Sequence, residues 1–259
     1  MLRRGTLAAR RSLSFLRPAA KPPHLRALVT SLGVMKHSTH SIGQFFELVS
    51  PSLHPRSGKV FYSGRAAFST HSPLYVIGVN PGGHPDNYVE ETVGAHSTRV
   101  MQTLPANWSA YRDESWEGFP PGTYGMAPPV LHMLAKLGLR PEAVPSSNLI
   151  FVRSRSEADL ADHFQDLAET CWPFHERVLA ELRPSVVLCL GKSAGDYVRR
   201  RLGAGRLVAE FREQNRRGWP SRVYAAPSGL KVVSVTHPSR VDWRNPAADP
   251  SALVASALA

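Results

Sequence analysis

Cysteine is scarce in this chain, and long apolar runs are absent. Among 259 residues there are two cysteines, Cys171 and Cys189, both inside apolar segments. Two thiols cannot form a four-thiolate metal site, and we interpret both as buried, reduced side chains, which favours a reducing compartment. No stretch reaches the roughly 18 consecutive apolar residues that a membrane-spanning helix needs, so we expect no membrane partner.

Acidic residues are missing from the beginning of the chain. The first is Glu47, whereas seven arginines and lysines precede Met35 and contribute most of the formal net charge of +11. This arginine-rich, acid-free leader resembles a mitochondrial transit peptide in composition. Alternatively, residues 1–34 are a disordered tail, or they precede a true start at Met35 in a cytoplasmic, bacterial-type protein. In both cases we predict that residues 35–259 form one folded domain.

Four short apolar runs have the composition of buried strands, and three helical patterns lie between or after them. We expect the helices over about Pro128–Leu139, Ala158–Leu182 and Lys192–Gly203, with Pro173 kinking or dividing the second. Alternating strands and helices predict a single three-layer α/β/α domain with a central four-stranded, mainly parallel sheet. The expected strands are Leu74–Val79, Asn148–Val152, Val186–Leu190 and Val232–Thr236.

Residues 84–125 show little periodicity and are rich in proline, glycine, asparagine and aromatic residues. A loop of this length at the carboxyl edge of a sheet is typical of a functional segment, so we expect it to shape a pocket. Its rings could stack on a planar ligand or simply pack locally. These rings belong to Tyr88, Trp108, Tyr111, Trp116, Phe119 and Tyr124.

Two short motifs follow the first and last predicted strands. The first is Gly-Val-Asn-Pro-Gly-Gly at residues 78–83, and the second is His-Pro-Ser-Arg at residues 237–240. Ligands of open α/β sheets bind beyond the carboxyl ends of parallel strands. We therefore expect Asn80 and His237 to contribute to one site at that edge.

These motifs, with the segment Ser-Asn-Leu-Ile-Phe-Val-Arg at residues 147–153 between them, resemble the uracil-DNA glycosylase superfamily. The first motif is similar to the water-positioning motif of its mismatch-specific and single-strand-selective branches. The last is similar to its closing His-Pro-Ser motif. The resemblance covers roughly residues 74–243 and implies the uracil-DNA glycosylase fold, a monomer, and metal-free, cofactor-free hydrolysis of a base from DNA in base excision repair.

The resemblance implies a role for each matching residue. Asn80 and His237 would be catalytic: Asn80 would orient the hydrolytic water, and His237 would stabilise the departing base as it gains negative charge. Asn148 and Gly82 would bind the extruded base. The DNA backbone or groove would be contacted by Gly83, Ser239 and Arg240.

One departure from the superfamily pattern concerns base choice. Gly82 stands where the most uracil-restricted branch places a tyrosine that blocks the methyl group of thymine. The pocket is therefore expected to admit 5-substituted pyrimidines or another deaminated or modified base. The resemblance also implies that the protein works where DNA is located. For a bacterial-type cytoplasmic protein this is the nucleoid, and if residues 1–34 are a transit peptide it is the mitochondrion.

Two other functions remain open. The chain could keep the fold and bind nucleic acid without catalysis. The Gly-Lys-Ser-Ala-Gly segment at residues 191–195 also fits a serine-hydrolase elbow, with Ser193 as nucleophile, Glu210 or Glu213 as the acid and His237 as the base. A basic run could contact phosphates or form a solvated face; it comprises Arg199, Arg200, Arg201, Arg206, Arg212, Arg216 and Arg217.

Overall fold

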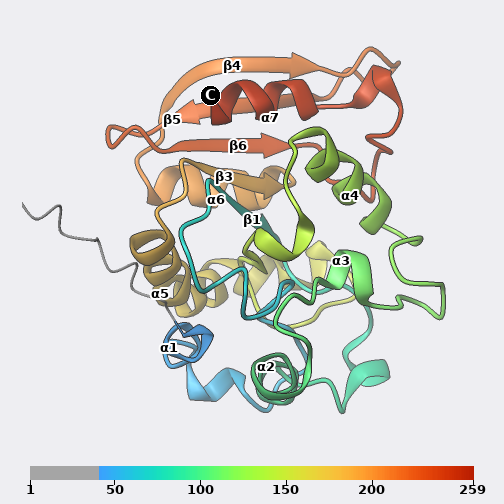
Figure 1. The fold of residues 1–259 in the computed structure, drawn as a ribbon, viewed down its shortest axis with the longest axis vertical. Helices are drawn as coiled ribbons and strands as arrows, with labels where there is room; N and C mark the ends of the chain where they lie inside the picture. The colour runs from blue at the N-terminus through green and yellow to red at the C-terminus, as the bar shows by residue number, and fades with distance from the viewer. Residues whose placement is uncertain (1–40) are drawn as a thin grey trace, which may run out of the picture. The chain divides into compact units, whose positions relative to one another are not determined.

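The computed structural model describes residues 41–259 (Figure 1). The leader interpretation of residues 1–34, and the start of the domain at residue 35, fall outside these described residues. No helix within residues 41–259 is both long and apolar enough to cross a membrane. The helices are α1 (Ile42–Phe46), α2 (Val93–Thr98), α3 (Ala110–Asp113), α4 (Ala127–Lys136), α5 (Phe164–Leu182), α6 (Lys192–Arg201) and α7 (Ser251–Leu258).

A single mixed sheet organises the described residues, with strand order β2-β1-β3-β6-β5-β4. The first four strands in this order pair in parallel, whereas β5 and β4 continue the sheet antiparallel. The α/β class and the mainly parallel sheet are confirmed. The strands are β1 (Leu74–Gly78), β2 (Ser146–Asn148), β3 (Val186–Leu190), β4 (Arg206–Arg212), β5 (Pro220–Ala225) and β6 (Lys231–Val235).

The expected strand number of four was too small, because the sheet contains six. Strand β4 was missed because it lies at the edge of the sheet and most of its side chains are exposed. Its sequence, Arg-Leu-Val-Ala-Glu-Phe-Arg, carries charge at both ends and in between, as edge strands commonly do. An exposed edge strand lacks the continuous apolar run by which the four parallel strands were recognised. Strand β5 beside it was missed as well, because only alternate side chains in it, Ser221 and Val223, are buried.

Two helical layers cover the sheet, because successive side chains of each buried strand point to opposite faces. Tyr75 and Ile77 of β1 pack in one core with helices α1, α5 and α6. Leu74 and Val76 pack in a second core with α4 and α7. Figure 1 shows α7 lying along β4 and β5. The helices of this three-layer arrangement cover the two faces of the sheet. The ends of the parallel strands are left open.

Three local expectations need correction. The strand predicted at Asn148–Val152 is instead β2, Ser146–Asn148; the buried run that follows packs in the core, since apolar sequence marks burial rather than strand pairing. The helix predicted from Ala158 begins as a 3-10 turn, Glu157–His163, and α5 then runs through Pro173 without division. The segment 84–125 also holds short helices, including α2, α3 and a π-helical turn, Arg99–Thr103.

Candidate functional site

The two motifs lie at the same end of the sheet, just beyond the carboxyl ends of the four parallel strands. Asn80 lies two residues beyond β1, Asn148 is the last residue of β2, and His237 lies two residues beyond β6. Between them, Gly191 follows β3 with a positive φ of 106°. A Cβ atom on Gly191 would lie 3.6 Å from His237 Cβ and 3.9 Å from a Val79 methyl group, so His237 packs over the end of β3 beside the first motif.

Asn80 has a fixed side chain. Its Nδ2 donates to Ser154 Oγ at 2.9 Å and to the Pro81 carbonyl at 2.8 Å. Because both bonds use the amide nitrogen, they fix the plane of the amide and leave Oδ1 as an oriented acceptor. An amide cannot take up a proton at neutral pH, so this arrangement can orient a water molecule but cannot act as a general base.

His237 is held as a neutral donor. The Ser239 backbone N–H donates to His237 Nδ1 at 3.1 Å, and Ser239 Oγ lies 2.7 Å from the same nitrogen. A ring nitrogen that accepts a backbone N–H carries no proton, so Nε2 carries the proton of the neutral ring. Burial, with a further contribution from the Arg240 charge, lowers the pKa of His237 to about 4. At neutral pH this histidine therefore offers an N–H from Nε2 without a full positive charge.

Asn148 lies deeper than Asn80. It is paired with Gly78 in the β1–β2 ladder and is 5% exposed. Its Oδ1 lies so close to Gly78 that a Cβ atom there would overlap it. Its Nδ2 is buried with no hydrogen-bond partner among residues 41–259. A buried unpaired donor is destabilising by about 1–3 kcal/mol, and such groups often mark a place where a ligand binds.

Gly82 opens onto a cavity of about 360 Å³. No atom lies within 4 Å of the position that a Cβ atom would take, so nothing narrows the cavity at this residue. Tyr62 lines the same cavity, and its backbone N–H donates at 2.8 Å to the carbonyl of Ser146, the first residue of the strand that ends at Asn148. Gly82 and Asn148 are therefore associated with one cavity.

The aromatic residues of segment 84–125 differ in their surroundings. Trp108 and Tyr111 are buried in the core. Tyr88, Trp116 and Tyr124 line the Gly82 cavity. Phe119 stacks on Tyr124 with ring centroids 4.3 Å apart, and both rings are exposed. The expectation that this segment shapes a pocket is confirmed, while the choice of a base-stacking ring stays a prediction.

A charged group at this cavity was missed in the sequence. Lys59, 6% exposed, pairs with Glu114 and with Glu91 at 3.2 Å. Arg153 pairs with Glu91, donates to the Gly82 carbonyl and lies 3.9 Å above the Tyr88 ring. Although burial opposes its charge, the neighbouring carboxylates raise the pKa of Lys59 and keep it protonated. No short sequence motif indicates this charged group, because its members lie far apart in the chain.

The three residues expected to contact DNA have different surroundings. Gly83 has a φ of 105°, and a Cβ atom there would lie 2.8 Å from the Tyr88 ring, so a larger residue would displace that ring. Ser239 and Arg240 are exposed at the end of the sheet. The Arg240 carbonyl accepts a hydrogen bond from Arg217 at 2.7 Å, which joins the second motif to the basic segment after β4.

A second cavity, of about 450 Å³, is lined by His237, Arg240 and Ser193 but not by Gly82. Its residues do not form the triad of a serine hydrolase. Ser193 Oγ donates to Glu157, and His237 Nδ1 is engaged by Ser239. Glu210 pairs with Arg222. Glu213 bonds to Asn215. The hydrogen bonds that a Ser-His-acid relay requires are thus made to other partners in the described residues.

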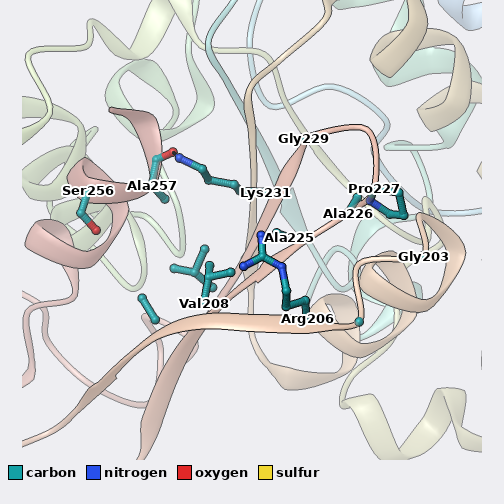
Figure 2. Close-up of a pocket in the computed structure, with 13 residues that line it drawn as sticks. Gly203, Arg206, Val208, Ala225, Ala226, Pro227, Gly229, Lys231, Ser256 and Ala257 are labelled. Atoms are coloured by element: carbon teal, nitrogen blue, oxygen red, sulfur yellow. Dashed lines mark hydrogen bonds between the residues drawn. The ribbon is translucent and has the colours of Figure 1, made fainter.

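A third cavity, of about 900 Å³, lies at the other end of the sheet, where the parallel strand β6 begins (Figure 2). Lys231, the first residue of β6, lines it and donates to the Ala257 carbonyl at the end of α7, at 2.7 Å. Arg206 at the start of β4 also lines it. No aspartate, glutamate, histidine or cysteine is among the described residues that line this cavity. Within residues 41–259, histidine, cysteine, aspartate and glutamate side chains form no cluster that could hold a metal ion.

Comparison with known proteins gives one informative similarity. No protein-family model matches the chain. A type-4 uracil-DNA glycosylase from Archaeoglobus fulgidus is 30% identical to it over 135 residues. The alignment covers 51% of this chain and 63% of the relative, so the chain spans less than two thirds of that protein's length.

Proposed function

Because this chain belongs to the uracil-DNA glycosylase superfamily, we propose that it hydrolyses the N-glycosidic bond of uracil or another deaminated or modified base in DNA. The observation that supports this most is the fixed Asn80 amide at the same sheet edge as the neutral His237. We propose a monofunctional enzyme, because Lys59, the lysine at the cavity, is paired with two carboxylates and protonated, and a protonated amine cannot attack carbon.

Asn80 would act on the water. With Nδ2 donating to Ser154, Oδ1 can accept a hydrogen bond from a water molecule and direct a lone pair of that water at the anomeric carbon. Fixing a nucleophile in this way lowers the entropic part of the barrier. Since the amide does not remove the proton, the reaction would depend on the glycosidic bond being largely broken before the water attacks.

His237 would act on the base. As the bond breaks, the electron pair goes to the base, which becomes an anion, and Nε2–H of His237 can donate to one of its carbonyl oxygens. A donor that is already oriented stabilises this charge without reorganisation. The low pKa of His237, about 4, makes the role one of hydrogen bonding rather than proton transfer.

The base itself would enter the Gly82 cavity. Extruded bases are read by hydrogen bonds to their edges and by stacking on aromatic rings. The unpaired Asn148 Nδ2 offers a donor for a base carbonyl, and Tyr88, Trp116 and Tyr124 offer rings. Gly83, Ser239 and Arg240 would contact the flanking DNA backbone or groove, which positions the strand without reading its sequence.

The proposed partner is DNA that contains a damaged or deaminated base, and we propose that the protein acts as a monomer. Within base excision repair it would leave an abasic site. We propose a cytoplasmic, nucleoid-associated place of action. A mitochondrial address is the alternative if the first 34 residues are a transit peptide.

The experiment is base release from labelled oligonucleotides that contain uracil, hypoxanthine, xanthine, 5-hydroxymethyluracil or a thymine mismatch, as single strands and duplexes. Asn80→Ala and His237→Ala should each lower the single-turnover rate at least a hundredfold, with melting temperatures close to wild type. Ser193→Ala is the matched control, because the hydroxyl of Ser193 lies at the same edge but has no role in this mechanism. Full activity in the Asn80 or His237 variant would refute the assignment.

The second candidate function is binding of nucleic acid without catalysis, which the exposed basic residues around Arg217 and Arg240 favour. It predicts salt-dependent DNA binding with no release of any base in the panel. Base release that depends on Asn80 would exclude it.

A further inference from the structure

We propose that Glu114 is a base-reading residue of the Gly82 cavity: its Oε2 atom accepts a hydrogen bond from a ring N–H of the bound base, next to the carbonyl that Asn148 reads. This inference rests on the proposed function and adds a residue that the superfamily resemblance does not include. It identifies the substrate class as bases with adjacent carbonyl and N–H groups. Uracil, hypoxanthine and xanthine have this edge, whereas cytosine and adenine do not.

The first observation is an unsatisfied acceptor. Glu114 lines the cavity, and its Oε2 is buried with no hydrogen-bond partner among the described residues. Both cations near it bind the other oxygen, since Lys59 and, at 4.0 Å, Arg99 each approach Oε1. A buried carboxylate oxygen without a donor is costly unless something else supplies one. A base that enters the cavity with an N–H would supply it.

The second observation is an unsatisfied donor beside the same cavity. Asn148 is 5% exposed, with Oδ1 against Gly78 and Nδ2 unpaired among the described residues. Tyr62 connects the two groups, because it lines the cavity and its backbone N–H donates to the Ser146 carbonyl at 2.8 Å, in the short strand that ends at Asn148. Asn148 can therefore donate to a carbonyl, while Glu114 provides the acceptor that a neighbouring N–H needs.

Lys59 has a positioning role in this arrangement. Its ammonium group holds Glu114 through Oε1, with Glu91 as its second partner, so the orientation of Glu114 is fixed. A carboxylate accepts hydrogen bonds and donates none. The ring nitrogens N3 of cytosine and N1 of adenine are acceptors in the same position, so Glu114 would repel them. Discrimination against cytosine and adenine would thus come from charge as well as from shape.

The first test compares Glu114→Gln with wild type on the best substrate of the oligonucleotide panel. We expect a single-turnover rate at least tenfold lower, with unchanged affinity for the abasic product duplex. Glu117→Gln is the matched control, because Glu117 lines the same cavity but is exposed and bonds to the Tyr88 hydroxyl at 2.9 Å. Equal rates for wild type, Glu114→Gln and Glu117→Gln would overturn the base-reading role of Glu114. They would not contradict the proposed function.

The second test needs no variant and so does not depend on the folding of Glu114→Gln. Free uracil and hypoxanthine are titrated into the wild-type protein, with the fluorescence of Trp116 in the cavity as the signal and Trp116→Phe to identify it. The same titration compares 1-methyluracil with 1,3-dimethyluracil and 9-methylhypoxanthine with 1,9-dimethylhypoxanthine, in which the glycosidic nitrogen is blocked as it is in DNA. The dimethyl compounds have no ring N–H and should bind at least tenfold more weakly than their monomethyl partners. Equal affinity would overturn the inference. If the wild type neither binds nor releases any base, the proposed function fails as well.

Discussion

Gly78 and Asn148 are partners in the β1–β2 ladder, and the Asn148 carboxamide occupies the space where a side chain on Gly78 would begin. The glycine of the first motif thus makes room for the amide of the middle segment. Two motifs that are separated by 70 residues of sequence depend on each other for space.

Gly78→Ala is expected to displace Asn148 and to destabilise the protein by about 1–3 kcal/mol, as overpacking of a core does. Base release should fall with it, because the donor to the base carbonyl is moved. Urea unfolding and single-turnover release measure the two effects. Gly82→Ala is the control: its Cβ atom meets nothing within 4 Å, so its unfolding free energy should stay within about 0.5 kcal/mol of wild type. Equal stability of the two variants would contradict the close contact.

Ser154→Ala removes one of the two acceptors for Asn80 Nδ2 and leaves the Pro81 carbonyl as the other. One hydrogen bond contributes about 1 kcal/mol, so we expect kcat to fall roughly five- to tenfold. The KM for oligonucleotide should not change, since Ser154 orients Asn80 and does not bind DNA in this mechanism. Steady-state kinetics at several oligonucleotide concentrations separate the two parameters. A change confined to KM would show that Ser154 acts in binding instead.

Stability should decrease as the pH falls from about 6.5 to about 4. Burial lowers the pKa of His175 to about 4, and its ring lies 2.8 Å from the Tyr75 hydroxyl and 3.2 Å from the Leu149 carbonyl. The unfolded chain, with an ordinary histidine pKa of about 6.5, binds a proton in this range and the folded chain does not. The loss is on the order of 3 kcal/mol.

Urea unfolding at several pH values tests this, with His175→Gln as the comparison because glutamine can both donate and accept but does not titrate. The variant should show a smaller decrease between pH 6.5 and 4 than wild type. Parallel curves for the two proteins would show that His175 does not carry the effect.

Lys59→Met should destabilise the protein by about 3 kcal/mol, because it leaves the carboxylate of Glu114 buried with only Arg99 nearby. Thermal or urea unfolding measures the change. Arg244→Met is the control, since Arg244 and Asp242 are both exposed where they pair at 2.7 Å, and exposed pairs contribute about 0–1 kcal/mol. A small effect at both positions would mean that the Lys59 pair is well solvated.

Charge reversal at Arg216 and Arg217 tests the basic segment after β4. Both side chains are exposed, and Arg217 bonds to the Arg240 carbonyl of the second motif. If they contact phosphates, the double variant should bind DNA more weakly and lower the slope of log K against log salt by about 0.9 for each phosphate that is no longer neutralised. Unchanged affinity and slope would identify this segment as a solvated face.

Local patterns in the sequence were sufficient for three of the four parallel strands, β1, β3 and β6, and for three of the seven described helices, α4, α5 and α6. Strand β3 was predicted at the observed residues, and the helix after it begins at Lys192 as expected. Apolar runs identify buried strands because both faces of such a strand are covered. The same rule missed β4, whose side chains are largely exposed, and it extended the strand at Asn148 into a buried segment outside the ladder.

What the sequence by itself determined is the parallel sheet and the placement of Asn80 and His237 beyond its strands, because strand ends and turn residues are adjacent in the chain. Tertiary structure alone decided what surrounds them. Ser154 fixes Asn80, Ser239 makes His237 a donor at Nε2, and the Lys59–Glu114 pair gives the Gly82 cavity its charge. Lys59 and Glu114 are 55 residues apart, and only burial in a common cavity makes their interaction strong enough to matter.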